Sequence, residues 1–172
     1  MGNGGLVVGR VVPIGGQVPP SGLVKKSNSF FRRSMELNYV AIVVATVLQF
    51  FAGSLWYMTI FGKTWGAMHG YDKLSQEEQD KAQKGMGPYL VAQFVGTLVT
   101  TFVLALFMAG LPAEWNAFGI AGFFWLGFVV PTQASAVMFG GTPKEWMCKK
   151  IAIMAGGSLL CLMIAAAVLH FF

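Results

Sequence analysis

The chain has 172 residues, of which 55% are hydrophobic and only 11% charged, and its mean hydropathy is +0.62. A water-soluble domain carries about 25% charged residues, so this composition excludes an ordinary soluble domain and indicates a membrane protein. The net charge of +5 does not predict nucleic-acid binding. The basic residues lie before and between apolar runs, where they set topology and meet lipid headgroups.

Residues 1–34 differ in composition from the rest of the chain. They are rich in Gly, Pro and Ser and lack acidic residues, and the pair Pro19-Pro20 excludes a long helix there. We interpret this segment as a basic, Gly/Pro-rich N-terminal arm that lies on lipid headgroups or on a partner. An organelle transit segment has a similar composition and stays an alternative. Residues 35–172 form the second, transmembrane domain.

The first apolar run covers residues 37–62 without a charged residue. At about 1.5 Å per residue a helix of this length reaches roughly 39 Å, more than the ~30 Å hydrocarbon layer. Gln49, Gly53 and Trp56 follow one another at i, i+4 and i+7, so they share one face of the helix. We interpret this face as a helix-packing surface, and a polar site inside the bundle is the alternative.

The end of this run has an unusual set of interface residues. Trp56 and Tyr57 have amphipathic rings that prefer the headgroup level, and Lys63 reaches the headgroups. We expect Gly62 to end the helix and Trp65 to return to the interface. An aromatic pocket for a lipid or a quinone-like ligand is the alternative interpretation of these rings.

A short polar helix is predicted in the charged loop that follows. Ser75 and Glu78 have the S-x-x-E spacing of a capping box. Two i, i+4 pairs of opposite charge support the helix: Glu77 with Lys81, and Asp80 with Lys84. Glycines then end it, and Pro88 suits the first turn of the next helix.

Three further uncharged runs cover residues 85–113, 115–143 and 151–172. Each is long enough to cross a bilayer. Gln93 begins a polar stripe in the second run. Trp115 at the start of the third and Trp146 before the fourth are expected at the membrane interface.

Pro131 interrupts the third run and removes one backbone hydrogen bond. Thr132 and Gln133 follow at once and are able to satisfy the freed carbonyl groups. Broken helices with polar neighbours bind substrate in transporters, so this cluster is a candidate interior site. We prefer a structural kink with local repair, because proline is common in membrane helices, and the interior site is the alternative.

These runs predict an all-α, polytopic membrane protein with four transmembrane helices and a short polar helix in the first loop. The positive-inside rule is nearly balanced between the arm and the loops. We prefer the loops on the cytoplasmic side, and the opposite orientation stays open. The host membrane is either a plasma membrane or an organelle inner membrane.

Four segments carry a resemblance to a known family: LNYVAIVVA at 37–45, GSLWY at 53–57, FGKTW at 61–65 and WLGF at 125–128. In this order they resemble a family of small four-helix integral membrane proteins of unknown function. The resemblance covers residues 37–172 and implies the four-span fold. It brings no catalytic residue, substrate or cofactor, and marks only the exit motif from Trp56 to Trp65.

The sequence shows no nucleophile–base pair, no metal-ligand spacing and no phosphate-binding loop, and the apolar runs contain no charge. We therefore expect no enzymatic activity and no cofactor, but an accessory or scaffold subunit that acts through helix packing and its basic arm. Its expected partners are membrane lipids, and other proteins or further copies of itself. Two alternatives stay open. One is a small oligomeric transporter or channel with Gln49, Gln93 and Gln133 along one polar path, and the other is a lipid- or pigment-binding module.

Overall fold

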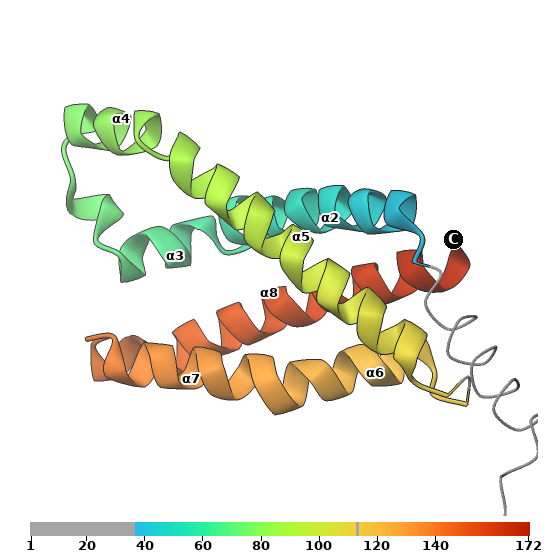
Figure 1. Cartoon of the computed structure of the whole chain (residues 1–172). Helices are drawn as coiled ribbons and strands as arrows, with labels where there is room; N and C mark the ends of the chain where they lie inside the picture. Colours follow the sequence, from blue (N-terminus) through green and yellow to red (C-terminus); the bar gives the residue numbers. More distant parts are fainter. Residues whose placement is uncertain (1–36, 113) are drawn as a thin grey trace, which may run out of the picture. The chain divides into compact units, whose positions relative to one another are not determined.

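The computed structural model describes residues 37–112 and 114–172, and every regular element in this part of the chain is a helix. Four helical stretches are long and apolar enough to cross a membrane: Tyr39–Ile60, Gly87–Gly110, Ala117–Phe139 and Lys144–Phe171. The predicted all-α fold with four spans is thereby confirmed (Figure 1). The N-terminal arm predicted at 1–34 lies outside the described residues.

The first span consists of α2 (Tyr39–Ser54) and a π-helical continuation, η1 (Leu55–Ile60). Asn38 caps its start, because the side-chain oxygen accepts from the N–H of Ala41 at 3.0 Å. The amide nitrogen of Asn38 also donates to the carbonyl of Phe172 at 3.1 Å, which joins the start of the first span to the end of the last.

The first span ends two residues earlier than predicted. Phe61 leaves the helical conformation (φ −109°, ψ 7°), and Gly62 starts a new helix, α3 (Gly62–Met68), instead of ending the old one. The N–H of Trp65 reaches back to the carbonyl of Phe61 at 2.7 Å and closes the first turn of α3. The chain therefore turns at Phe61 and continues as a helix.

The polar helix expected in the first loop is α4 (Gln76–Lys84), which follows a short 3₁₀ turn, η2 (Tyr71–Lys73). The reciprocal capping box between Ser75 and Glu78 is present, and Lys81 pairs with Glu77 at 2.8 Å. The second predicted pair does not form as expected. Asp80 instead accepts a hydrogen bond from the side chain of Gln76 at 3.3 Å.

The second span is α5 (Gly87–Gly110), with Pro88 in its first turn as predicted. The third consists of α6 (Ala117–Phe124), a π-helical segment η3 (Trp125–Val129) and α7 (Val130–Phe139). A proline clashes with the carbonyl four residues before it, and a wider π turn relieves this crowding. The interruption expected at Pro131 is therefore present as the π-helical segment that directly precedes it.

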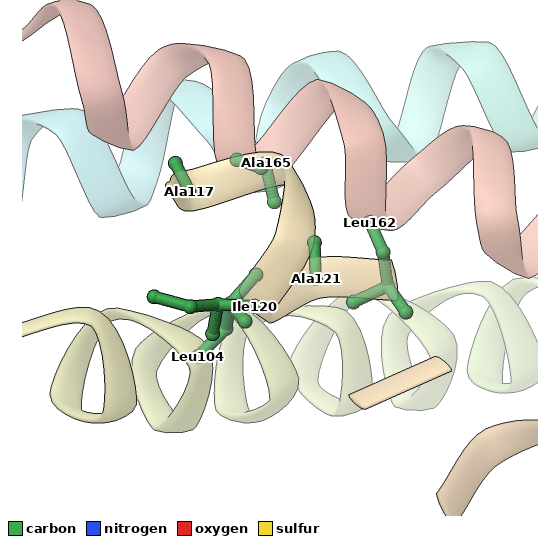
Figure 2. Packing of buried hydrophobic residues seen from close by; sticks show 7 residues of the cluster. Leu104, Ala117, Ile120, Ala121, Leu162 and Ala165 are labelled. Carbon is green, nitrogen blue, oxygen red and sulfur yellow. The ribbon is translucent and has the colours of Figure 1, made fainter. Parts of the chain in front are cut away.

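The fourth span, α8 (Lys144–Phe171), packs against α2, α6 and α7, whereas α5 packs mainly on α2. The buried cluster where α5, α6 and α8 meet consists largely of small side chains. Its members are Leu104, Ala117, Ile120, Ala121, Leu162, Ala165 and Ala166. Figure 2 shows Leu104 of α5 against Ile120 of α6. Small residues let helices approach closely, which is how helices associate in lipid.

The capping box makes the first turn of α4 sensitive to pH. The backbone N–H and the hydroxyl of Ser75 both donate to the Glu78 carboxylate at 2.8 Å, and these bonds hold its pKa below the ordinary value of 4.5. Because the folded-state pKa is lowered, the stabilisation is complete above pH 4.5 and is lost as the pH falls through the lower folded value.

We expect NMR titration of the intact protein to give Glu78 a pKa below 4.5. Ser75→Ala removes the hydroxyl donor and should move that pKa part of the way back, because the backbone donor remains. Hydrogen exchange in the first turn of α4 should speed up in the same variant. A Glu78 pKa that does not respond to Ser75→Ala would contradict the role of the capping box.

Candidate functional site

Two tryptophans from different spans donate their indole N–H groups to the backbone of α8. Nε1 of Trp56 donates to the carbonyl of Ile153 at 3.0 Å, and Nε1 of Trp125 donates to the carbonyl of Ala155 at 2.9 Å. We call these two hydrogen bonds the indole clamp. An N–H group that is taken out of water without a hydrogen-bond partner costs roughly several kcal/mol, so each indole is stabilised by its acceptor. The clamp ties the first and third spans to the fourth.

Two adjacent glycines in α8 make room for the Trp56 ring. A Cβ atom on Gly156 would lie 2.9 Å from Cζ2 of Trp56, and one on Gly157 would lie 2.9 Å from its Cδ1. Cβ atoms essentially never come this close to another atom, so the Trp56 ring lies directly on the α8 backbone. The ring of Trp56 thus packs between the first and fourth spans, and its predicted role as an interface anchor stays a prediction.

Both clamp tryptophans occupy the same position in a π turn. The carbonyl of Trp56 accepts from the N–H of Phe61, five residues on, and the carbonyl of Trp125 accepts from that of Val130. The sequence holds a signal for this equivalence that our sequence analysis missed. Ala-Gly-x-x-Trp occurs at residues 52–56 and again at 121–125. The two glycines of this repeat both face α8, through Cys161 and Met163.

The other exit residues form an aromatic column beside the start of α8. The rings of Tyr57 and Trp65 lie 4.8 Å apart between centroids, and those of Trp65 and His69 lie 4.6 Å apart. The ammonium group of Lys150 lies 5.9 Å from the centre of the Trp65 ring. This combination of aromatic rings and a lysine is typical of the headgroup level.

The remaining predicted anchors lie at the ends of spans. Lys63 is exposed on α3, and Trp146 lies in the first turn of α8 beneath the ammonium group of Lys149, at 5.2 Å. Trp115 precedes α6 and is 51% exposed. Their contact with a membrane surface stays a prediction, because the structure contains no membrane.

The structure separates the three glutamines of the candidate polar interior. Gln49 is 3% exposed, and its amide donates to the hydroxyl of Thr101 at 2.7 Å. Gln133 accepts a hydrogen bond from Ser158 of α8 at 3.5 Å. Gln93 is exposed on α5 and bonds only to Thr97 of its own helix, at 3.4 Å, within the part of the chain that the structure describes. In that part, no hydrogen bond joins any two of the three, so the arrangement gives no support to a shared polar path.

The residues directly after the proline bond to their own helix or to α8. Pro131 and Thr132 are exposed, and the Thr132 hydroxyl donates to the carbonyl of Phe128 at 2.6 Å. Only Gln133 turns toward α8, where it meets Ser158. The contacts therefore match local repair of the π-helical segment.

A cavity of about 360 Å³ lies where the first and third spans begin and the second and fourth end. Its lining includes Asn38, Ala105, Trp115, Ile120 and His170. Among residues 37–112 and 114–172, no group of three or more His, Cys, Asp or Glu side chains is placed to hold a metal ion.

The clamp can be tested by removing one indole N–H while keeping an aromatic ring. We expect Trp125→Phe to lower the free energy of unfolding, because one interhelical hydrogen bond is lost. The expected decrease is about 0.6 to 2 kcal/mol. The measurement is thermal unfolding in detergent, followed by circular dichroism. Trp115→Phe is the matched control, since this ring is half exposed, and equal destabilisation by both changes would contradict the clamp.

The comparisons with known proteins give one match. A family model described as a protein of unknown function, DUF1761, matches residues 40–170. No curated protein and no solved structure matches the chain. The family match agrees with the resemblance to an uncharacterised family, while the exit motif as a family mark stays a prediction. Because the match covers most of the chain, the protein belongs to the DUF1761 family of proteins of unknown function.

Proposed function

We propose that this protein is a non-enzymatic structural subunit of a membrane assembly, which binds a partner helix along the outer face of α5. The observation that carries this proposal is an exposed amide, Gln93, inside a membrane-spanning helix. The alternatives would require either a shared polar path or an enclosed ligand site among the residues named by the sequence. Gln49, Gln93 and Gln133 each bond to a different partner, and this arrangement favours neither alternative.

The outer face of α5 has the spacing of a helix–helix seam. Tyr89, Gln93, Gly96 and Thr100 follow one another at intervals of four, three and four residues. This 3.5-residue repeat is the pattern by which two helices wind around each other. We call these four residues the α5 seam. The first three are exposed and Thr100 is half exposed, although the seam lies within an apolar span.

The position of Gln93 makes exposure to lipid unfavourable. It lies six residues into α5, about 9 Å along the helix, and thus inside the hydrocarbon layer. Thr97 and Thr100 donate their hydroxyls to backbone carbonyls of their own helix at 2.9 and 3.0 Å, so their presence in lipid costs little. The amide of Gln93 has donor and acceptor capacity left over, and a neighbouring helix is the natural partner for it.

The rest of the bundle supports a static role. The indole clamp ties the first and third spans to α8, and Gln49 bonds to Thr101 between α2 and α5. α5 itself packs on α2, where the ring centroids of Phe94 and Phe50 lie 5.6 Å apart. It reaches α6 near its C-terminal end, where the ring centroids of Phe107 and Phe124 lie 5.5 Å apart. The N-terminal half of α5 lies apart from α7 in Figure 1. Tyr89, Gln93 and Gly96 are exposed, so the seam is accessible to a further helix.

Purification from native membranes in mild detergent tests this proposal. We expect the protein to elute with a stoichiometric partner chain, a different protein or a further copy, identified by mass spectrometry and native mass. Gln93→Leu should weaken the association, because the amide can no longer bond across the interface.

Val91→Leu is the matched control, because Val91 is 65% exposed on the opposite side of the same helix. It should leave the association unchanged. A monomer that brings down no other chain, or equal loss of the partner in both variants, would contradict the proposed function.

A further inference from the structure

We infer that the helix bound by the α5 seam is the α5 of a second copy of this chain. This inference rests on the proposed function, since it names the partner of the same surface. The pairing is symmetric, about a two-fold axis along the membrane normal, so that each seam faces the other.

The α5 seam is complementary to itself. Tyr89 and Gln93 carry hydroxyl and amide groups that both donate and accept hydrogen bonds. The Thr100 hydroxyl donates to the carbonyl of Gly96 and is still able to accept a hydrogen bond. The seam contains no charged residue, so two copies meet without repulsion between like charges. In a symmetric interface the same surface patch of both copies meets, so the patch must be complementary to itself. Groups that are able to accept as well as donate hydrogen bonds meet this requirement.

Symmetry also solves the problem of depth in the membrane. A polar group in hydrocarbon benefits only from a partner at its own level, because water is absent there. A two-fold axis along the normal places the Gln93 amides of both copies at the same depth. A different protein would need a polar group at the matching level on an otherwise apolar helix.

Gly96 allows the two backbones to approach closely. A Cβ atom added at Gly96 would meet nothing within 4 Å, so the space beside it is open in a single chain. It lies one turn from Gln93 and one turn from Thr100, at the centre of the seam. Small residues at such positions are typical of close helix pairs in membranes.

The opposite flank of α5 lacks these features. Val91 and Val95 are exposed there, and both are wholly apolar. At 100° per residue, Val95 is turned about 160° away from Gln93, although the two lie at nearly the same depth. This flank provides a control face on the same helix.

Cysteine cross-linking in native membranes tests the inference. Gly96→Cys is made in the full chain with Cys148→Ser and Cys161→Ser, and two copies with different epitope tags are expressed together. We expect mild oxidation to give a disulfide-linked product that carries both tags. Val95→Cys should give little of it. Adding Gln93→Leu to Gly96→Cys should weaken the pairing about 3- to 10-fold, and Val91→Leu should not.

The outcomes separate this inference from the proposed function. A Gly96→Cys product that contains a different protein overturns the pairing of two copies but agrees with a partner on the seam. Equal two-tag products from Gly96→Cys and Val95→Cys overturn the symmetric seam. The absence of any partner, both in cross-linking and in mild-detergent purification, overturns both.

Discussion

Hydrogen bonding of indole groups to the backbone of α8 is the constraint on which the arrangement of the bundle depends. The carbonyls of Ile153 and Ala155 already belong to a helix and still accept from Trp56 and Trp125. Such contacts are possible only where a ring comes close to the backbone, and Gly156 and Gly157 permit this approach for Trp56. The last span is thereby the common support for the first and the third.

The π-helical segments fit the same constraint. η1 and η3 each begin at or next to a clamp tryptophan, and π turns recur at functional positions in helices. In the third span, Pro131 provides a reason for the wider turn. In the first span, which has no proline, we attribute the wider turn to the contact of Trp56 with α8. The repeated Ala-Gly-x-x-Trp segment thus corresponds to one packing device used twice against one helix.

The sequence predicts local features of this protein well, because their causes are local. Charge-free length predicts the four spans, the Ser75–Glu78 spacing predicts the cap of α4, and Pro88 predicts the start of α5. The sequence near a residue does not indicate which distant residue it will contact. Nothing near Gln49 specifies Thr101 as its partner, and nothing near Trp56 specifies the carbonyl of Ile153. The three glutamines are alike in the sequence, but the structure buries one, turns one to α8 and leaves one on the surface.

We propose that the α5 seam faces protein rather than lipid in the membrane. Spin labels at neighbouring positions measure this directly, because oxygen concentrates in the hydrocarbon layer and collides with labels exposed to it. For the full chain in bilayers, we expect low oxygen accessibility for a label at Gly96→Cys and high accessibility at Val95→Cys. High and equal accessibility at both positions would contradict it.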